Sequence, residues 1–201
     1  KNNFALEGIF SNYLFEDINT DDEKIYRLIL NGIDVLDFKD KNKCILNEFI
    51  EWYTDNSIDS FDKGWKWHYY TPECIRKLLI ELVDIKNKSS IFDLCSGIGG
   101  TLVEAVNINP DIKVYGEEIA LEAYYLSKIN LIFNGKNDFK LKLGNILTDP
   151  LVDENNNLEK FDAVTGNFPF GSEIKSLEEK LKNDIYNRFD FINTPLNAGD
   201  W

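Results

Sequence analysis

The sequence has 201 residues, of which 43% are hydrophobic, so it is long enough to bury one core and a small appendage. Thirty-five acidic residues against 22 basic ones give a net charge of −13, the wrong sign for a protein that grips nucleic-acid phosphates unaided. A membrane or secreted protein is disfavoured, because the sequence shows neither an apolar run near ~18 residues nor a signal-peptide pattern, and three cysteines without a C-x-x-C pair favour the reducing cytoplasm.

The first part of the chain is predicted to be a helical N-terminal module over residues 1–58. Residues 23–32 end in an Asn-Gly helix stop, and residues 45–53 keep apolar side chains at helical spacing. Residues 59–64 form the predicted linker. A second, catalytic domain is expected over residues 65–201.

After the linker, strands and helices alternate in the manner of an α/β fold. Thr71 and Pro72 supply an N-cap and a first-turn proline for a helix. The predicted apolar face of this helix consists of Ile75, Leu78, Leu79, Leu82 and Val83. Strands are expected at 90–94, 112–116, 139–143 and 161–166, and helices at 101–108 and 120–133. This alternation specifies a parallel sheet with helices on both faces.

A glycine-rich turn follows the first strand of the predicted sheet. Asp93 lies in the strand, and the residues that lead into the next helix include Ser96, Gly97, Gly99, Gly100 and Thr101. Such a layout brings backbone N–H groups close to a small ligand. It differs from the dinucleotide fingerprint G-x-G-x-x-G, whose last glycine would fall at Leu102. Taken alone, the glycines also fit a tight βα turn.

Two later strand ends favour ligand binding. Glu118 follows Asp93 by 25 positions, near the ~20-residue offset at which an acid reaches ribose hydroxyls in nucleotide-binding folds. The fourth strand runs into Asn167, whose amide oxygen can accept a hydrogen bond from an exocyclic amine, and Phe170 can lie flat against a planar ring. An Asn before a Pro is also ordinary turn chemistry, so the upstream motifs decide the interpretation.

The motifs occur in an order that resembles a known family. They are Tyr69-Tyr70-Thr71-Pro72, Asp93-x-x-x-Gly97-x-Gly99-Gly100, Gly116-Glu117-Glu118-Ile119, Gly144-Asn145-Ile146-Leu147 and Asn167-Phe168-Pro169-Phe170-Gly171. Over roughly residues 45–201, the chain resembles the modification subunit of type I restriction-modification systems. It departs from that family at Phe168, where Pro is usual, and at Asn145, where Asp is frequent.

The resemblance implies a methyltransferase that transfers a methyl group from S-adenosylmethionine to adenine N6 in DNA. The implied fold is Rossmann-like, with a mostly parallel sheet of seven strands. Beyond Phe170 the sequence offers a charged, helix-prone run at 176–186, predicted to be an exposed helix, and a Pro/Asn/Gly loop at 193–199. The three remaining strands are therefore expected beyond Trp201, and the lack of any Met also suggests a truncated or internal piece.

The resemblance also implies a cofactor site along the strand ends. Thr71, flanked by Tyr70 and Pro72, would approach the methionine part of the cofactor, as would the main chain of residues 96–101. Asp93 would orient that turn or accept from the cofactor's ammonium group. No metal is expected.

The ribose and the two adenines have their own implied partners. Glu118 would accept the ribose hydroxyls, and Asn145 with Ile146 would hold the cofactor adenine. The implied catalytic residues are Asn167, Phe168, Pro169 and Phe170. The Asn167 side chain and the Phe168 carbonyl would accept the two N–H bonds of the target amine, Pro169 would keep Phe168 extended, and Phe170 would stack on a flipped adenine.

Partners follow from the charge and the resemblance together. DNA is expected to be bound through a complex in which a specificity subunit, with or without a restriction subunit, supplies the basic surface. Within this chain the basic surface is predicted at Arg76-Lys77 and residues 136–142, and Glu117 is expected to be solvated. Two alternatives stay open: an RNA or protein amino-methyltransferase, and a non-catalytic cofactor-binding subunit.

Overall fold

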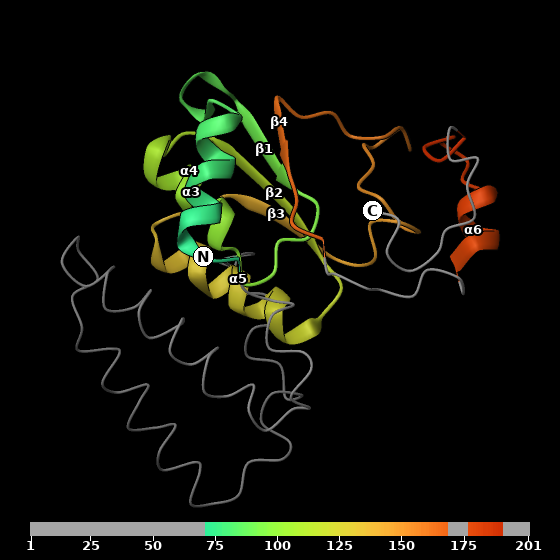
Figure 1. The fold of residues 1–201 in the computed structure, drawn as a ribbon, viewed down its shortest axis with the longest axis horizontal. Coiled ribbons are helices and arrows are strands. Elements are labelled where there is room, and N and C mark those ends of the chain that lie inside the picture. The colour runs from blue at the N-terminus through green and yellow to red at the C-terminus, as the bar shows by residue number, and fades with distance from the viewer. Residues whose placement is uncertain (1–70, 169–176, 191–201) are drawn as a thin grey trace, which may run out of the picture.

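The described part of the chain is built on a four-stranded parallel sheet with strand order β3-β2-β1-β4 (Figure 1). The computed structural model describes residues 71–168 and 177–190. The strands are β1 (Ser90–Asp93), β2 (Lys113–Glu118), β3 (Phe139–Leu143) and β4 (Ala163–Thr165). All four predicted strands are found. The predicted N-terminal module, together with Tyr70, Pro169 and Phe170, lies outside the described residues.

The longer helices follow the predicted order and lie on one side of the sheet. They are α3 (Glu73–Leu82), α4 (Gly100–Ile108) and α5 (Leu121–Phe133), with the shorter η4 (Ile85–Asn87) and α6 (Glu178–Lys182). Figure 1 shows α3, α4 and α5 together, whereas the segment joining β3 to β4 runs on the other side with residues 177–190. Phe161 from that segment packs on Phe92 and Tyr115, at centroid distances of 4.6 and 4.9 Å. Within the described residues, the other side of the sheet carries the short α6 alone, so the predicted covering of both faces by helices is seen only in part.

The core lies between the sheet and these helices. Ile91 and Phe92 in β1 are both buried, because a central parallel strand is covered on both faces. The buried cluster consists of Ile80, Ile85, Ile91, Leu102, Val103, Ala105, Val106, Ile112, Val114, Leu131 and Ala163. None of the helices in the described ranges is long and apolar enough to span a bilayer.

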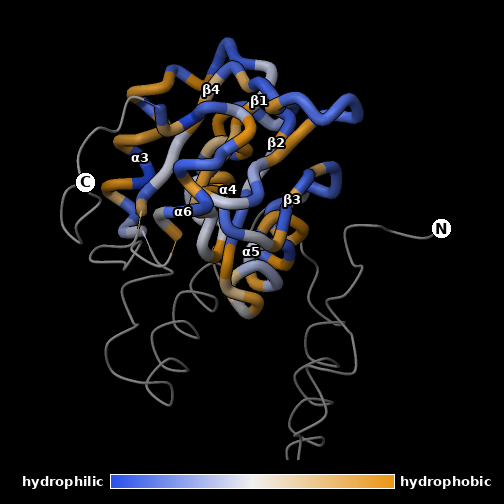
Figure 2. The backbone as a smooth tube through the Cα atoms, turned by 90° about the vertical axis from the view of Figure 1, so that its right-hand side faces the viewer, coloured by the Kyte–Doolittle hydropathy of each residue, from blue (hydrophilic) through white to orange (hydrophobic). Residues whose placement is uncertain are grey.

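The packed face of helix α3 overlaps the predicted one only in part, because Val83 packs against the core and Leu79 is half-buried. Ile75, Leu78 and Leu82 are exposed, whereas Arg76 and Ile80 are buried against α4. The helix has apolar residues on two sides, so its hydrophobic pattern does not identify the packed face (Figure 2). The cap also differs from the prediction. Pro72 is the N-cap residue, and no side chain provides a capping hydrogen bond.

The pairing of β4 with β1 is fixed at its beginning by Asp162. Its Oδ2 accepts hydrogen bonds from the backbone N–H of Ser89 and Ser90, at 3.0 and 3.1 Å, and from the Ser90 hydroxyl at 3.1 Å. The backbone N–H of Asp162 donates in return to the Ser90 hydroxyl at 3.0 Å. The register that follows pairs Ile91 with Ala163, Phe92 with Val164 and Asp93 with Thr165.

Candidate functional site

The predicted site residues lie together at the carboxyl-terminal end of the sheet. The chain steps from β1 through β2 to β3 in one direction and then places β4 on the opposite side of β1. Open α/β sheets bind ligands at such a switch point, outside the carboxyl ends of the strands. Asp93 ends β1, Glu118 ends β2, and Asn167 lies two residues beyond the end of β4.

The glycine-rich turn after β1 has no room for a side chain at Gly99 or at Gly100. Gly97 and Gly99 have left-handed φ values of 53° and 80°. A Cβ on Gly99 would lie 2.5 Å from Ser127 Oγ, and one on Gly100 would lie 2.7 Å from Arg76 Cδ. These glycines let the main chain of the turn pass close to its neighbours.

Glu118 ties this turn to the end of β2. The carboxylate is buried, and its Oε2 accepts from Gly97 N at 2.8 Å while Oε1 accepts from Ala120 N at 2.8 Å. Burial raises the pKa of Glu118, against the lowering effect of the backbone donors Ala120 and Gly97. A carboxylate has about four lone-pair sites, so ribose hydroxyls can still be accepted beside these two bonds. Its position in the structure adds a role that the sequence did not indicate, which is to hold the turn.

Asp93 lies beneath the same turn. It is only 2% exposed, and its Oδ1 accepts from Cys95 N at 3.2 Å. Burial raises the pKa of Asp93 to about 7, and the nearby Glu118 charge adds to the shift, whereas hydrogen bonds from Cys95 and Thr101 oppose it. Of the two roles expected for Asp93, this geometry favours the orientation of the turn. Ser96 is buried in the turn, and its hydroxyl has no hydrogen-bond partner among the described residues.

The turn after β4 contacts Thr71, which lies just before Pro72, the N-cap residue of α3. Asn167 Nδ2 donates to Thr71 Oγ1 at 3.2 Å, across 96 positions of sequence. Both Asn167 and Phe168 are exposed at this end of the sheet. The bond orients the amide with its nitrogen toward Thr71, and it brings the motif predicted for the target base beside the motif predicted for the cofactor's methionine part.

Arg76 supports this junction, although the sequence assigned it to the basic surface. It is 7% exposed, Nη1 donates to Thr71 O at 2.8 Å, and Nη2 lies 3.7 Å from Glu104 Oε1. Its aliphatic stem lies against Gly100, where a Cβ would collide with it. The expectation of surface charge at Arg76 was therefore wrong. The feature of the sequence that could have indicated this packing is the presence of an arginine in α3 and a glycine at the start of α4.

Asn145 shapes the turn that follows β3. Its Oδ1 accepts from Leu147 N at 3.0 Å, and its carbonyl accepts from Thr148 N and Asp149 N at 2.9 and 2.8 Å. Short polar side chains commonly close turns in this way. The amide oxygen predicted to hold the cofactor adenine is thus already engaged within the turn. Its second lone pair and the Nδ2 donors are the groups that remain for a ligand.

Glu117 is buried, which contradicts the expectation that it is solvated. It is 1% exposed, and neither carboxylate oxygen has a hydrogen-bond partner within the described ranges. Because side chains alternate along a strand, it points to the opposite face from Glu118, where Gly144 closes over it. Burial raises the pKa of Glu117 to about 7, against the opposing positive charge of Lys142.

Replacing Glu117 with Gln is expected to stabilise the protein at about pH 8. Between its ordinary pKa of 4.5 and the folded value of about 7, the folded state keeps a proton that the unfolded state has lost, so stability falls as the pH rises. A neutral amide is less costly to bury than a carboxylate, and the expected gain is about 1–3 kcal/mol. Urea unfolding at about pH 5.5 and about pH 8 should show the larger gain at the higher pH.

Glu154→Gln provides the matched control, because Glu154 is exposed. It should leave the free energy of unfolding unchanged at both pH values. A loss of stability in Glu117→Gln at about pH 8 would contradict the view that Glu117 is an unfavourably buried carboxylate.

Comparison with known proteins places these motifs in a family. The model of the N-6 DNA methylase family matches residues 47–201. The MjaVIII methylase subunit of a type I restriction enzyme from Methanocaldococcus jannaschii is 30% identical over 94% of this chain, which spans 33% of that protein. A release factor glutamine methyltransferase from Clostridium acetobutylicum is 27% identical over 55% of this chain and 39% of its own length.

A solved structure has the same fold. The methyltransferase subunit of a type I restriction-modification system from Streptococcus thermophilus superposes with a TM-score of 0.66, covering 95% of this chain and 41% of that one at 18% identity. The predicted fold class, a Rossmann-like methyltransferase sheet, is therefore confirmed. With the family model covering residues 47–201, the chain belongs to the N-6 DNA methylase family.

Proposed function

We propose that this chain carries the cofactor site and the base-binding turn of a DNA adenine N6-methyltransferase that belongs to a type I restriction-modification system. The observation that carries the proposal is the hydrogen bond from Asn167 to Thr71. It joins the turn suited to an exocyclic amine to the residue suited to the methionine part of the cofactor, at the switch point of the sheet.

The strand ends fit S-adenosylmethionine. Gly97 and Gly99 bend the main chain sharply at their left-handed φ values, and Ser96 offers a buried hydroxyl that lacks a partner among the described residues. Thr71, flanked by Tyr70 and Pro72, would hold the methionine part. The turn itself, which runs through Gly100 to Thr101 at the start of α4, would lie beneath it.

The acidic and amide side chains complete the cofactor site. Asp93 would keep the turn in place, and Glu118 would accept the ribose hydroxyls with its remaining lone pairs. Asn145 and Ile146 would border the adenine. The bound cofactor supplies an electrophilic methyl group on a sulfonium centre.

The turn after β4 is suited to activating a planar amine. Asn167 Oδ1 and the Phe168 carbonyl would accept the two N–H bonds of a flipped adenine, so the nitrogen lone pair becomes less delocalised into the ring. As the nitrogen forms its bond to the methyl carbon and the bond from that carbon to sulfur breaks, these two oxygens stabilise the positive charge that develops on nitrogen, which then releases one proton to water. Pro169 and Phe170 follow directly in the sequence, and Phe170 would stack on the base.

DNA affinity would come from a partner. The net charge of −13 repels a polyanion, and Arg76, which the sequence had assigned to the basic surface, is buried. A specificity subunit would supply the cationic surface and sequence recognition, with or without a restriction subunit in the same cytoplasmic complex. The similarity to a protein named as a methylase subunit of a type I restriction enzyme supports this assignment.

A protein amide is the second candidate substrate. The similarity to a release factor glutamine methyltransferase favours it, because a side-chain amide presents a planar nitrogen much as adenine does. The two functions share the cofactor site and differ in what occupies the turn at Asn167.

The product distinguishes the candidates. The purified protein is incubated with S-adenosylmethionine and, in parallel reactions, with duplex DNA, RNA or a glutamine-bearing protein. Each reaction is run with and without a co-expressed specificity subunit, and the digested products are analysed by mass spectrometry. N6-methyladenine is expected, and its yield should depend on the partner. Methylcytosine, or methyl transfer to RNA or protein alone, would refute the DNA adenine assignment.

A further inference from the structure

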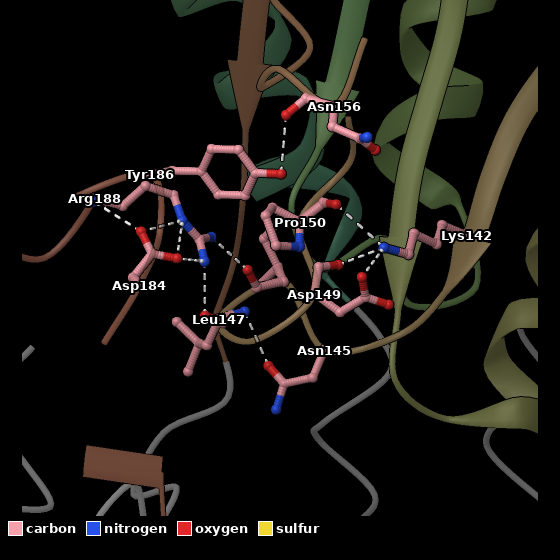
Figure 3. A network of polar contacts seen from close by, with 10 residues as sticks. Lys142, Asn145, Leu147, Asp149, Pro150, Asn156, Asp184, Tyr186 and Arg188 are labelled. Atoms are coloured by element: carbon pink, nitrogen blue, oxygen red, sulfur yellow. Dashed lines mark hydrogen bonds and ion pairs between the residues drawn. The ribbon is translucent and has the colours of Figure 1, made fainter. Parts of the chain in front are cut away.

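Residues 177–190 turn back onto the loop that follows β3, and Arg188 makes the contact. Its guanidinium is paired with Asp184 through Nη2 to Oδ1 at 2.7 Å and through Nε to both carboxylate oxygens at 3.2 Å (Figure 3). The Arg188 backbone N–H also donates to Asp184 Oδ2 at 2.9 Å. The Asp184 carboxylate thereby fixes the plane of the guanidinium.

The other edge of the guanidinium binds two successive carbonyls. Nη1 donates to Ile146 O at 2.7 Å and Nη2 donates to Leu147 O at 2.9 Å, across 42 and 41 positions of sequence. These are the peptide units next to Asn145, whose side chain closes the same turn through Leu147 N. A planar group with several fixed donors can hold two adjacent carbonyls at once, which a lysine ammonium cannot do with the same geometry.

We propose that Arg188 is a positioning residue for the adenine end of the cofactor site. Held by Asp184, it fixes the 145–148 turn and therefore the direction of the Asn145 side chain. The inference rests on the proposed function, because the ligand of that turn is the cofactor adenine. Arg188 itself touches the turn through its carbonyls, so its effect on the ligand is transmitted by Asn145 and Ile146.

The same segment has a second attachment that does not involve this turn. Tyr186 donates its hydroxyl hydrogen to Asn156 O at 3.1 Å (Figure 3). Asn156 lies in the turn of residues 153–157, which Asp153 closes through the backbone N–H groups of Asn155 and Asn157. Tyr186→Phe thus removes a contact of the segment while leaving the 145–148 turn untouched, which makes it the matched control.

The experiment measures binding of two ligands by isothermal titration. They are S-adenosylhomocysteine and its 6-oxo analogue, in which a carbonyl oxygen replaces the exocyclic amine of adenine. Wild-type protein should prefer the amine form, because the groups around Asn145 are set for it. Arg188→Ala should weaken binding of S-adenosylhomocysteine by about tenfold, equivalent to the loss of about one well-formed hydrogen bond, and should reduce the preference between the two ligands.

The remaining variants separate positioning from general stability. Arg188→Lys should recover only part of the preference, and Asp184→Asn, which keeps the size of the side chain, should lose part of it. Tyr186→Phe should bind both ligands as the wild type does. Adding Asn145→Ala to Arg188→Ala should weaken binding no further than Asn145→Ala alone, since both changes act through one side chain.

Two results would overturn the inference. One is an unchanged preference in folded Arg188→Ala, and the other is an equal loss for both ligands that Tyr186→Phe reproduces. Failure of the wild-type protein to bind S-adenosylhomocysteine would instead refute the proposed cofactor site.

Discussion

Replacing Asn167 with Ala is expected to lower the rate of adenine methylation about 10²–10³-fold. The amide oxygen is proposed to accept from the amine as charge develops on nitrogen, so its loss removes an interaction that is strongest in the transition state. Cofactor affinity should stay within about twofold of the wild type, because the change removes one bond to the Thr71 hydroxyl and nothing from the glycine turn. Methyl transfer in the reconstituted complex measures the rate, and titration with S-adenosylhomocysteine measures the affinity.

Asn157→Ala provides the control, because Asn157 is exposed in the turn of residues 153–157. It should leave both quantities unchanged. A wild-type rate of methylation in Asn167→Ala would show that the Asn167 side chain is not the acceptor for the target amine.

Replacing Gly99 with Val should abolish measurable cofactor binding, a loss of at least about 100-fold. Gly99 has φ of 80°, where a β-branched residue is strained, and a Cβ there would lie 2.5 Å from Ser127 Oγ and 3.2 Å from Ser127 Cα. The turn must move to relieve this overlap. It would then carry Gly97 away from Glu118, whose carboxylate accepts its N–H at 2.8 Å. Isothermal titration with S-adenosylmethionine tests the result.

Gly135→Val isolates the effect of backbone strain. Gly135 has φ of 82° just beyond the end of α5, so the same residue meets a similar conformation outside the proposed site. This variant should lose stability and keep its affinity for the cofactor. Wild-type affinity in Gly99→Val would show that the glycine turn does not form the cofactor site.

The sheet could be predicted from local sequence because its strands contain short apolar or alternating runs bounded by turn residues. Ile91 and Phe92, or Val114 and Tyr115, carry the β-branched and aromatic side chains that fit a pleated, buried surface. Strand order β3-β2-β1-β4 was not assigned from the sequence, but the placement of site residues at strand ends required only that the strands be parallel.

What the sequence could not provide depends on contacts between distant segments. Helix α3 has apolar residues on two sides. The packed side is the one that carries Arg76, whose side chain lies against Gly100 and donates a hydrogen bond to the Thr71 carbonyl. Glu117 and Glu118 are adjacent, yet only Glu118 has partners for its carboxylate among the described residues. Arg188 reaches the turn after β3 from 42 residues away, and no local pattern marks it.

Asp162 constrains the position of the turn after β4, although it lies at the opposite end of that strand. A slip of β4 by one residue against β1 would move Asn167 by about 3.3 Å along the sheet. The same slip would turn alternate side chains to the other face and expose Ala163 and Thr165, which are now buried. Because Asp162 accepts hydrogen bonds from Ser90, the first residue of β1, and from Ser89 just before it, the shifted pairing is disfavoured before the strand reaches the site. The distance between the target base and the methyl donor would then be set five residues upstream of Asn167, by a carboxylate that touches neither.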